Sequence, residues 1–469
     1  MKVALIYPPY GRGRRSRYFP FGLAYVASAL VQDGHEVRAI DMEGEDLDVD
    51  QAVRRTLSES PDVIGFGGMI TRYRYVREIA NRVREELPGA FLMAGNSGAT
   101  TLPEMYLRAC RLDAVVLGEG ETTARSLVSA LQNGDDWRGT SGIAYLRKSG
   151  EMALSEPREL LPDLDALPFP AWDLFPVEKY VRSVDHRQKY TRHLEVVASR
   201  GCPYGCVYCF RIYGRTIRRR SPESVVAEVE EIVRRYDIRY TGFPDDLFTS
   251  DRDFVMRTCR LLRERVPGIR WSCMGRVNTV DPEMLSVMRE SGCDWISFGI
   301  ESGSDEMLRR MKRGVDSTQC LEAVRMTREA GIHPDGSFMI GMFGETGDTV
   351  AETVDFCRRA DMTGPILFVT PYPGTEIFGE ALRRGLIPDV EKLVESMDAA
   401  DRLLVNLSEL PDEDLIALKE WAQGRIGLEY LLRRPFSRIP ALLIRHLYLR
   451  GLGKIVEDFR EAIRGSRAR

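Results

Sequence analysis

The sequence lacks an apolar segment that could cross a membrane, because no run of about 18 uncharged apolar residues occurs in it. Neither sign of charge is in large excess: 66 Lys and Arg stand against 70 Asp and Glu, which gives a net charge of −4. The pI is near 6.0, whereas nucleic-acid-binding domains are typically basic. The first seven residues form one short apolar run that ends at Pro8-Pro9, which is not the pattern of a signal peptide. We therefore expect a cytoplasmic protein that binds neither nucleic acid nor, stably, a membrane.

Clustered metal ligands are scarce as well, and only three cysteines stand close together. Cys202, Cys206 and Cys209 are spaced x3 and then x2. A zinc ribbon would need a second Cys or His pair nearby, but the next cysteine is Cys259 and the nearest histidines lie upstream. The spacing suits a short loop around one iron–sulfur cube whose fourth iron has no protein ligand. The six scattered cysteines, Cys110, Cys259, Cys273, Cys293, Cys320 and Cys357, are typical of small buried side chains in a reducing compartment.

This cysteine loop resembles that of the radical SAM superfamily, and Tyr208 fills the place of the aromatic residue that precedes the third cysteine in that family. The resemblance implies a 4Fe–4S cluster on Cys202, Cys206 and Cys209, which are then the catalytic and metal-binding residues. It also implies that the open iron chelates S-adenosylmethionine (SAM) through its amino and carboxylate groups. Reductive cleavage of SAM would give a 5′-deoxyadenosyl radical that abstracts hydrogen from a substrate.

Residues 193–376 alternate strands and helices, as expected of a partial (β/α)6 TIM barrel. The expected strands are 194–198, 240–243, 270–274, 295–299, 333–340 and 365–370. In such barrels the active site lies at the carboxyl ends of the strands. The resemblance assigns SAM contacts to residues at these strand ends: Tyr208, Asp245, Asp246, Arg276, Glu301, Ser302, Gly341, Tyr372 and Pro373. The alternative to SAM contacts for Asp245 and Asp246 is that one of them caps a helix and the other is solvated. The alternative for Arg276 is an ordinary arginine on the surface.

Residues 1–140 show a second alternation that predicts a doubly wound α/β domain with a Rossmann-like sheet. The expected strands are 2–7, 35–41, 63–67, 91–95 and 114–117, and helices are expected at 22–33 and 75–86. Ligands of such domains bind outside the carboxyl ends of the strands. The loop after residue 7 reads Tyr-Pro-Pro-Tyr rather than G-x-G-x-x-G, which counts against a dinucleotide.

This domain resembles the cobalamin-binding domain found upstream of many radical SAM enzymes. The resemblance makes cobalamin a candidate cofactor, with contacts at Gly68, Thr71, Gly95, Asn96, Ser97, Gly118, Glu119 and Gly120. Two departures keep an empty or repurposed crevice open as the alternative. The Asp-x-His-x-x-Gly motif of other corrinoid proteins is absent, and the run after residue 94 reads Gly-Asn-Ser-Gly-Ala-Thr instead of Gly-Gly-x-His-x-Thr.

Residues 141–192 are expected to be a linker with a small hairpin and a proline-rich segment whose aromatic residues need apolar cover. Residues 377–469 are expected to be helical, with helices at 391–397, 412–432 and 437–464. Helices that close the open side of the barrel are favoured over a basic, membrane-surface helix, which the residues between 431 and 449 would also allow.

Three functions follow as hypotheses. The first is a radical SAM enzyme for cobalamin-dependent C-methylation or related carbon chemistry of a small metabolite. The second is a cobalamin-free radical SAM lyase, dehydratase, epimerase or isomerase with a vestigial N-terminal domain. The third, a non-catalytic iron–sulfur electron-transfer protein, is disfavoured because such a cluster would take a fourth protein thiolate. Either enzyme would need an external electron donor of the flavodoxin or ferredoxin type.

Overall fold

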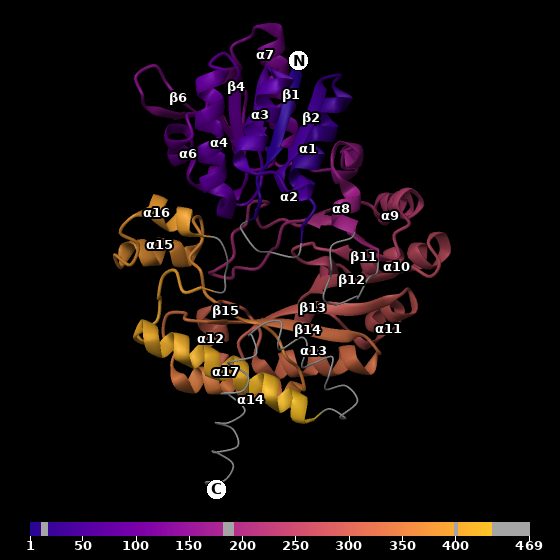
Figure 1. Cartoon of the computed structure of the whole chain (residues 1–469). Coiled ribbons are helices and arrows are strands. Elements are labelled where there is room, and N and C mark those ends of the chain that lie inside the picture. Colours follow the sequence, from indigo (N-terminus) through magenta and orange to yellow (C-terminus); the bar gives the residue numbers. More distant parts are fainter. Residues whose placement is uncertain (11–16, 182–191, 398–401, 434–469) are drawn as a thin grey trace.

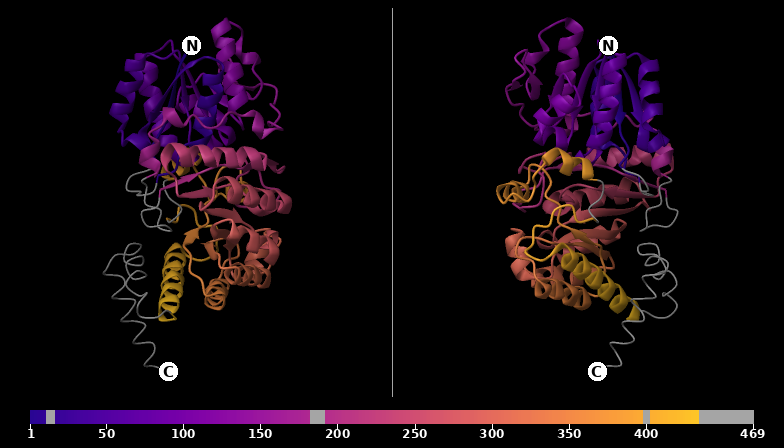
Figure 2. Two further views of the ribbon diagram at one scale, coloured as in Figure 1. Left: turned by 90° about the vertical axis from the view of Figure 1, so that its right-hand side faces the viewer. Right: turned by 60° about the vertical axis from the view of Figure 1, so that its left-hand side comes forward.

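The computed structural model describes residues 1–10, 17–181, 192–397 and 402–433. Two α/β units are stacked along the long axis of the molecule, with the N-terminal unit above the unit that carries the cysteine loop (Figure 1). The two views of Figure 2 show the same stacking from other sides. The helix predicted at 437–464 lies outside the described residues. No helix of the described part of the chain is long and apolar enough to span a membrane.

The N-terminal sheet has five parallel strands in the order β2-β1-β3-β4-β5. The strands are β1 (Lys2–Tyr7), β2 (Glu36–Asp41), β3 (Val63–Phe66), β4 (Phe91–Gly95) and β5 (Ala114–Val116). The helices are α1 (Phe21–Gln32), α2 (Met42–Glu45), α3 (Val49–Glu59), α4 (Tyr73–Glu86), α5 (Ser97–Thr101), α6 (Pro103–Ala109) and α7 (Glu121–Asn133). Alternate residues of β1 enter different cores: Val3 and Leu5 pack with α1 and α7, whereas Ala4 and Ile6 pack with α3 and α4. The domain is therefore doubly wound, which confirms the predicted fold class.

The predicted hairpin extends this sheet. Strands β6 (Ile143–Leu146) and β7 (Met152–Leu154) add antiparallel strands at the β5 edge, with Ala144 opposite Val115. The buried Ile143 and Ala144 cover an edge that would otherwise expose unpaired backbone groups. The sheet thus reaches into the segment predicted as a linker, and the domain limits at residues 140, 192 and 376 stay predictions.

The rest of the linker lies against the N-terminal domain. Trp172 is almost fully buried, and its ring centroid lies 4.5 Å from that of Phe19. Phe175, just before α8 (Val177–Val181), packs on the same Phe19 ring. The expected apolar cover for these aromatic side chains is present.

The second unit contains six parallel strands in the order β8-β11-β12-β13-β14-β15. These are β8 (His193–Glu195), β11 (Tyr240–Phe243), β12 (Arg270–Gly275), β13 (Cys293–Glu301), β14 (His333–Ile340) and β15 (Ile366–Phe368). Helices α9 (Pro222–Tyr236), α10 (Arg252–Arg265), α11 (Pro282–Glu290), α12 (Asp305–Arg310), α13 (Ser317–Glu329) and α14 (Gly347–Ala360) connect them. The sheet curls with these helices outside, as a partial barrel requires (Figure 1).

Three C-terminal helices follow: α15 (Glu376–Arg383), α16 (Val390–Ser396) and α17 (Asp412–Leu432). Helix α17 lies beside α14 and the edge strand β15 (Figure 1). The Gln423 side chain accepts a hydrogen bond from the Ile366 amide at 2.8 Å and donates one to the Gly364 carbonyl at 3.1 Å. The helix therefore covers the backbone of the open edge, as expected of helices that close the barrel.

Candidate functional site

The three cysteines lie on a loop whose ends are tied together. Strands β9 (Ser199–Arg200) and β10 (Arg218–Arg219) pair antiparallel on either side of the loop. Gly201 opens the loop with a φ of +95°, and a Cβ there would lie 2.4 Å from the Thr216 carbonyl oxygen, so the turn requires glycine. Inside the loop, the Val207 amide donates to the Met311 carbonyl at 3.2 Å, which anchors it over the barrel mouth.

Two buried arginines reach the Cys206 sulfur. Arg313 Nη1 lies 3.3 Å and Arg276 Nη1 lies 3.9 Å from Cys206 Sγ, and Arg276 also stacks on the Tyr204 ring at 3.7 Å. A hydrogen bond from the Cys209 thiol, followed by these arginines, lowers the pKa of Cys206 to about 4. Burial raises the pKa of Cys202. Of these two thiols, Cys206 is therefore the one that ionises more readily.

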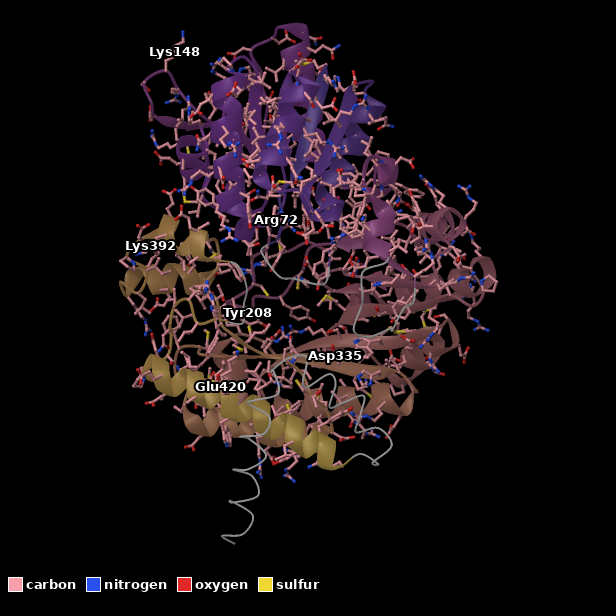
Figure 3. All side chains as sticks on the ribbon, viewed as in Figure 1. Arg72, Lys148, Tyr208, Asp335, Lys392 and Glu420 are labelled. Carbon is pink, nitrogen blue, oxygen red and sulfur yellow. The ribbon has the colours of Figure 1, made fainter. Side chains whose placement is uncertain are left out.

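Glu301 stands beside this centre in a strained conformation. Its φ is +72°, directly after a register shift between β13 and β14. The Glu301 side chain folds back so far that a Cβ on Gly299 would lie 2.6 Å from its Oε1 atom. Burial raises the pKa of Glu301, while Arg313 and Tyr208 oppose the rise. Figure 3 shows Tyr208 at the centre of the molecule, where the two units meet. Positive φ at a non-glycine residue is frequent at functional sites.

The predicted acidic pair is divided between two roles. Asp245 is only 2% exposed, and its carboxylate accepts hydrogen bonds from the Ala198 amide and the Ser199 hydroxyl, both at 2.9 Å. These bonds draw Ala198 out of the strand predicted at 194–198, so β8 ends at Glu195. Asp246 is exposed. Burial is the largest cause of the raised pKa of Cys202, and the negative charge of Asp246 raises that pKa further. Asp246 is thus the member of the pair that stands open near the cysteines.

Other predicted SAM residues have partners within the chain. The Ser302 hydroxyl is buried 3.1 Å from the Thr353 hydroxyl and accepts a hydrogen bond from the Ser304 amide. Gly341, with a φ of +92°, leaves room for Leu415 of α17. Tyr372 and Pro373 instead border a cavity in the N-terminal domain.

That cavity, of about 580 Å³, lies at the carboxyl ends of β1, β3, β4 and β5. All eight residues predicted to contact cobalamin line it: Gly68, Thr71, Gly95, Asn96, Ser97, Gly118, Glu119 and Gly120. Phe210, Ile212 and Tyr213 of the cysteine loop form another part of the wall. The crevice and the loop therefore share one boundary, and the volume lies in the range of cofactor sites.

The inner face of the barrel is partly open and polar. Along β13 and β14, residues that face the helices are buried and the alternating ones are half-exposed. Register places Met274, Ser297 and Asp335 in one row across the inner face, with Gly299 and Ser337 in the next row toward the cysteines. Met274 is 44% exposed although it lies in the middle of the sheet. Figure 3 labels Asp335 on this sheet, below Tyr208.

Comparison with known proteins agrees with both halves of this arrangement. Residues 196–357 match the Radical SAM superfamily, and residues 10–128 match the B12 binding domain. The chain is 32% identical over 399 residues to an uncharacterized methyltransferase of Pyrococcus horikoshii, covering 82% of this chain and 84% of the relative. The chain belongs to the radical SAM superfamily. The resemblance found in its sequence is confirmed, and the protein is a radical SAM enzyme with a B12-binding-type domain.

Two further relatives show the breadth of this group. An anaerobic magnesium-protoporphyrin IX monomethyl ester cyclase of Rubrivivax gelatinosus is 26% identical, over 93% of this chain and 80% of the cyclase. The structure of the radical SAM methyltransferase TsrM from Kitasatospora setae, with cobalamin and a [4Fe–4S] cluster bound, superposes with a TM-score of 0.71 at 19% identity. It covers 93% of this chain and 89% of TsrM, and it confirms the fold.

The residues present fit a 4Fe–4S cluster. Arg276 Nη2 and Arg313 Nε are buried donors without partners among the described residues, and they lie on side chains that already reach Cys206. An anionic cluster on Cys202, Cys206 and Cys209 would use them. No three His, Cys, Asp or Glu side chains of the described chain surround a single ion position. A cube does not need such a set, since each cysteine binds a different iron.

The crevice fits a large polar cofactor. The Thr71 hydroxyl is buried at its wall without a partner among the described residues. Gly118 has a φ of +71° and open space where a Cβ would lie, so the backbone there can approach a ligand closely. Superfamily membership implies the cluster and SAM as cofactors, and the B12-type domain adds cobalamin as the candidate for the crevice.

Sequence reasoning missed Arg313, Arg200 and Arg218. Arg313 is 107 residues from Cys206 in the chain, so only the fold brings them together. Arg200 and Arg218 flank the cysteine loop in the sequence, which was the available signal, and the structure pairs both with the buried Glu119.

Proposed function

We propose that this enzyme performs cobalamin-dependent radical C-methylation of a polar small molecule. The observation that carries the proposal is the shared boundary described above: one cavity is lined by the eight predicted crevice residues and by Phe210, Ile212 and Tyr213 of the cysteine loop. A corrinoid in that cavity would border the same space as SAM at the cluster. A cobalamin-free lyase would have no use for this continuity.

The chain's own residues have defined tasks in this proposal. Cys202, Cys206 and Cys209 would hold the cluster, and the guanidinium groups of Arg276 and Arg313 would offset its negative charge. Asp246 would accept hydrogen bonds from the SAM ammonium, and the carboxylate of Glu301 would accept them from the ribose hydroxyls of SAM. When bound, the cluster supplies the electron that cleaves SAM, and the corrinoid supplies the methyl group.

The inner face of the barrel supports a polar substrate. Ser337 offers a hydroxyl in the same row as Gly299, and Ser297 and Asp335 offer hydrogen-bonding groups one row below, roughly 7 Å further along the strands. A small molecule bound there would direct one end toward the cluster. We infer that an external flavodoxin- or ferredoxin-type protein supplies the electron.

Anaerobic reconstitution with iron, sulfide and hydroxocobalamin tests the proposal. We expect about four irons and one corrinoid per chain, and 5′-deoxyadenosine from SAM in the presence of a reductant. The Cys206→Ser variant should lose the cluster and the nucleoside but retain the corrinoid. Iron and nucleoside without corrinoid would refute cobalamin dependence and leave a lyase or isomerase.

A second pair of variants tests the crevice. Ser97→Phe would place a ring in the cavity and should abolish hydroxocobalamin binding while the cluster still loads. Ser149→Phe, in the exposed hairpin turn, is the matched control and should bind corrinoid as the wild type does. Equal corrinoid binding by both variants would place the corrinoid elsewhere.

A further inference from the structure

Four buried charged side chains join the crevice to the cysteine loop. Glu119, between β5 and α7, binds Arg200 at 2.9 Å and Arg218 through both of its oxygens, at 2.8 and 2.9 Å. Glu121, the first residue of α7, binds Arg200 at 2.6 Å. All four side chains are only 6–8% exposed. We call these residues the joint.

The joint is electrically balanced and strongly held. Burial alone would raise the pKa of Glu119, but hydrogen bonds from Arg218 and Arg200 hold it below its ordinary value. Arg218 uses the two-pronged geometry that a lysine cannot reproduce. A buried pair of this kind resists rearrangement because each charge would be left unpaired.

Its position gives the joint a role that an ordinary buried ion pair lacks. Arg200 ends the strand two residues before Cys202, and Arg218 begins the strand that closes the loop. Glu119 itself lines the crevice cavity. The linker is included as well, because the Leu161 amide donates to Glu119 at 3.0 Å and the Leu161 carbonyl accepts from Arg218 at 2.7 Å. The crevice, the linker and both ends of the cysteine loop are thus tied to one carboxylate.

We propose that the joint positions the cysteine loop against the crevice and makes the loop respond to a ligand in the crevice. The second half of this statement rests on the proposed function, in which the ligand is a corrinoid. Glu119, Glu121, Arg200 and Arg218 are positioning residues, since they act on SAM and substrate through the loop. Binding in the crevice limits the movement of Glu119, and the ion pairs pass that limit to both ends of the loop.

Hydrogen exchange of the peptides spanning residues 199–219 measures this directly in the reconstituted enzyme. We expect Glu119→Gln to speed exchange in this segment about tenfold, because Arg218 loses its charged partner and Arg200 keeps only Glu121. At a concentration at which both proteins hold bound corrinoid, hydroxocobalamin should slow exchange of the wild-type segment at least about fivefold and leave the variant segment unchanged. Glu104→Gln, which removes an exposed ion pair to Arg108 in the same domain, is the control and should match the wild type.

Two more variants keep the test decisive. If Glu119→Gln does not fold, Arg218→Met replaces it, since Arg200 then still pairs with both glutamates. Arg218→Lys keeps the positive charge but loses the two parallel hydrogen bonds of the guanidinium group. Its rate of hydrogen exchange and its response to hydroxocobalamin should therefore be close to those of Arg218→Met. Full rescue by lysine would show that charge alone suffices and would refute a positioning role.

The outcomes separate this inference from the proposed function. If the wild type binds no hydroxocobalamin, cobalamin dependence fails, and the joint is judged by loop exchange in the unliganded proteins. Faster exchange in Glu119→Gln than in Glu104→Gln then supports positioning. Wild-type exchange in Glu119→Gln would overturn it, as would an equal response of both proteins to the corrinoid.

Discussion

The Arg313→Gln variant should shift the ionisation of Cys206 in the cluster-free protein. In the wild type the pKa of Cys206 is lowered to about 4, so the thiolate is present at neutral pH. An unperturbed thiol, with a pKa of about 8.5, is only a few per cent ionised at pH 7. The first cause of the low value is the hydrogen bond from Cys209, and the next is Arg313, at 3.3 Å.

The size of the shift follows from that contact. A hydrogen bond to a charged group contributes about 1.5–3 kcal/mol. Since one pKa unit corresponds to about 1.4 kcal/mol, removing the Arg313 guanidinium should raise the pKa of Cys206 by about 1–2 units. The expected midpoint therefore moves to about 5–6.

Ultraviolet difference absorbance, wild type minus Cys206→Ser, reports the thiolate without a reagent that must enter a buried site. We expect a constant signal from about pH 9 down to about pH 5 in the wild type. The corresponding difference for Arg313→Gln, taken against Arg313→Gln with Cys206→Ser, should begin to fall at about pH 6–7. Arg215→Gln, an exposed arginine of the same loop, is the control. A wild-type midpoint near that of an ordinary thiol, or equal midpoints in both proteins, would refute the argument.

Three further predictions concern stability. Burial raises the pKa of Glu345 to about 7, so the wild type loses stability as pH rises from about 4.5 to 7. The melting temperature of Glu345→Gln, measured relative to the wild type, should therefore rise over that range and then level off. A difference in melting temperature that does not depend on pH would contradict this. Gly364→Ala puts a Cβ 2.0 Å from a backbone oxygen and should cost about 1–3 kcal/mol in urea unfolding, whereas Gly379→Ala, in an uncrowded stretch of α15, should gain up to about 1 kcal/mol. Glu228→Ala leaves Arg220 buried without its partner and should cost about 3–5 kcal/mol, so a loss below 1 kcal/mol would show that solvent reaches the pair.

Local patterns were sufficient for most of the fold. The strands at 2–7, 91–95, 240–243 and 333–340 were predicted with the bounds that the structure shows. The first two are mainly apolar, and all four end at a turn-forming residue: Pro8, Asn96, Pro244 or Gly341. The end of the first barrel strand was predicted three residues too late, at residue 198 rather than Glu195. Its last residues, 196–198, look like a strand, but the Asp245 carboxylate, 47 positions away, holds the Ala198 amide. No local pattern contains that contact.

The same distinction between local patterns and long-range contacts applies to the candidate site. That the three cysteines lie together, and that the eight crevice residues line one cavity, could be predicted because each group lies within a few positions or at the ends of successive parallel strands. Arg313 could not be found, since an arginine after a surface helix has no sequence feature that marks it as a partner of Cys206. The prediction that Asp245 contacts SAM rested on its position in a motif. Such a position gives the place of a residue in the chain but not the direction of its side chain.

Strand-end carboxylates were expected to meet ligands, yet two of them hold the chain itself. Asp245, from the barrel, fixes Ala198 and Ser199, and Glu119, from the N-terminal domain, fixes Arg200. The three consecutive residues before Gly201 and Cys202 are therefore held from both units. A reactive centre must be kept within a fraction of an ångström, and that precision depends on the groups behind the ligands. The acidic residues at these strand ends thus fix the path along which the cysteine loop leaves the barrel.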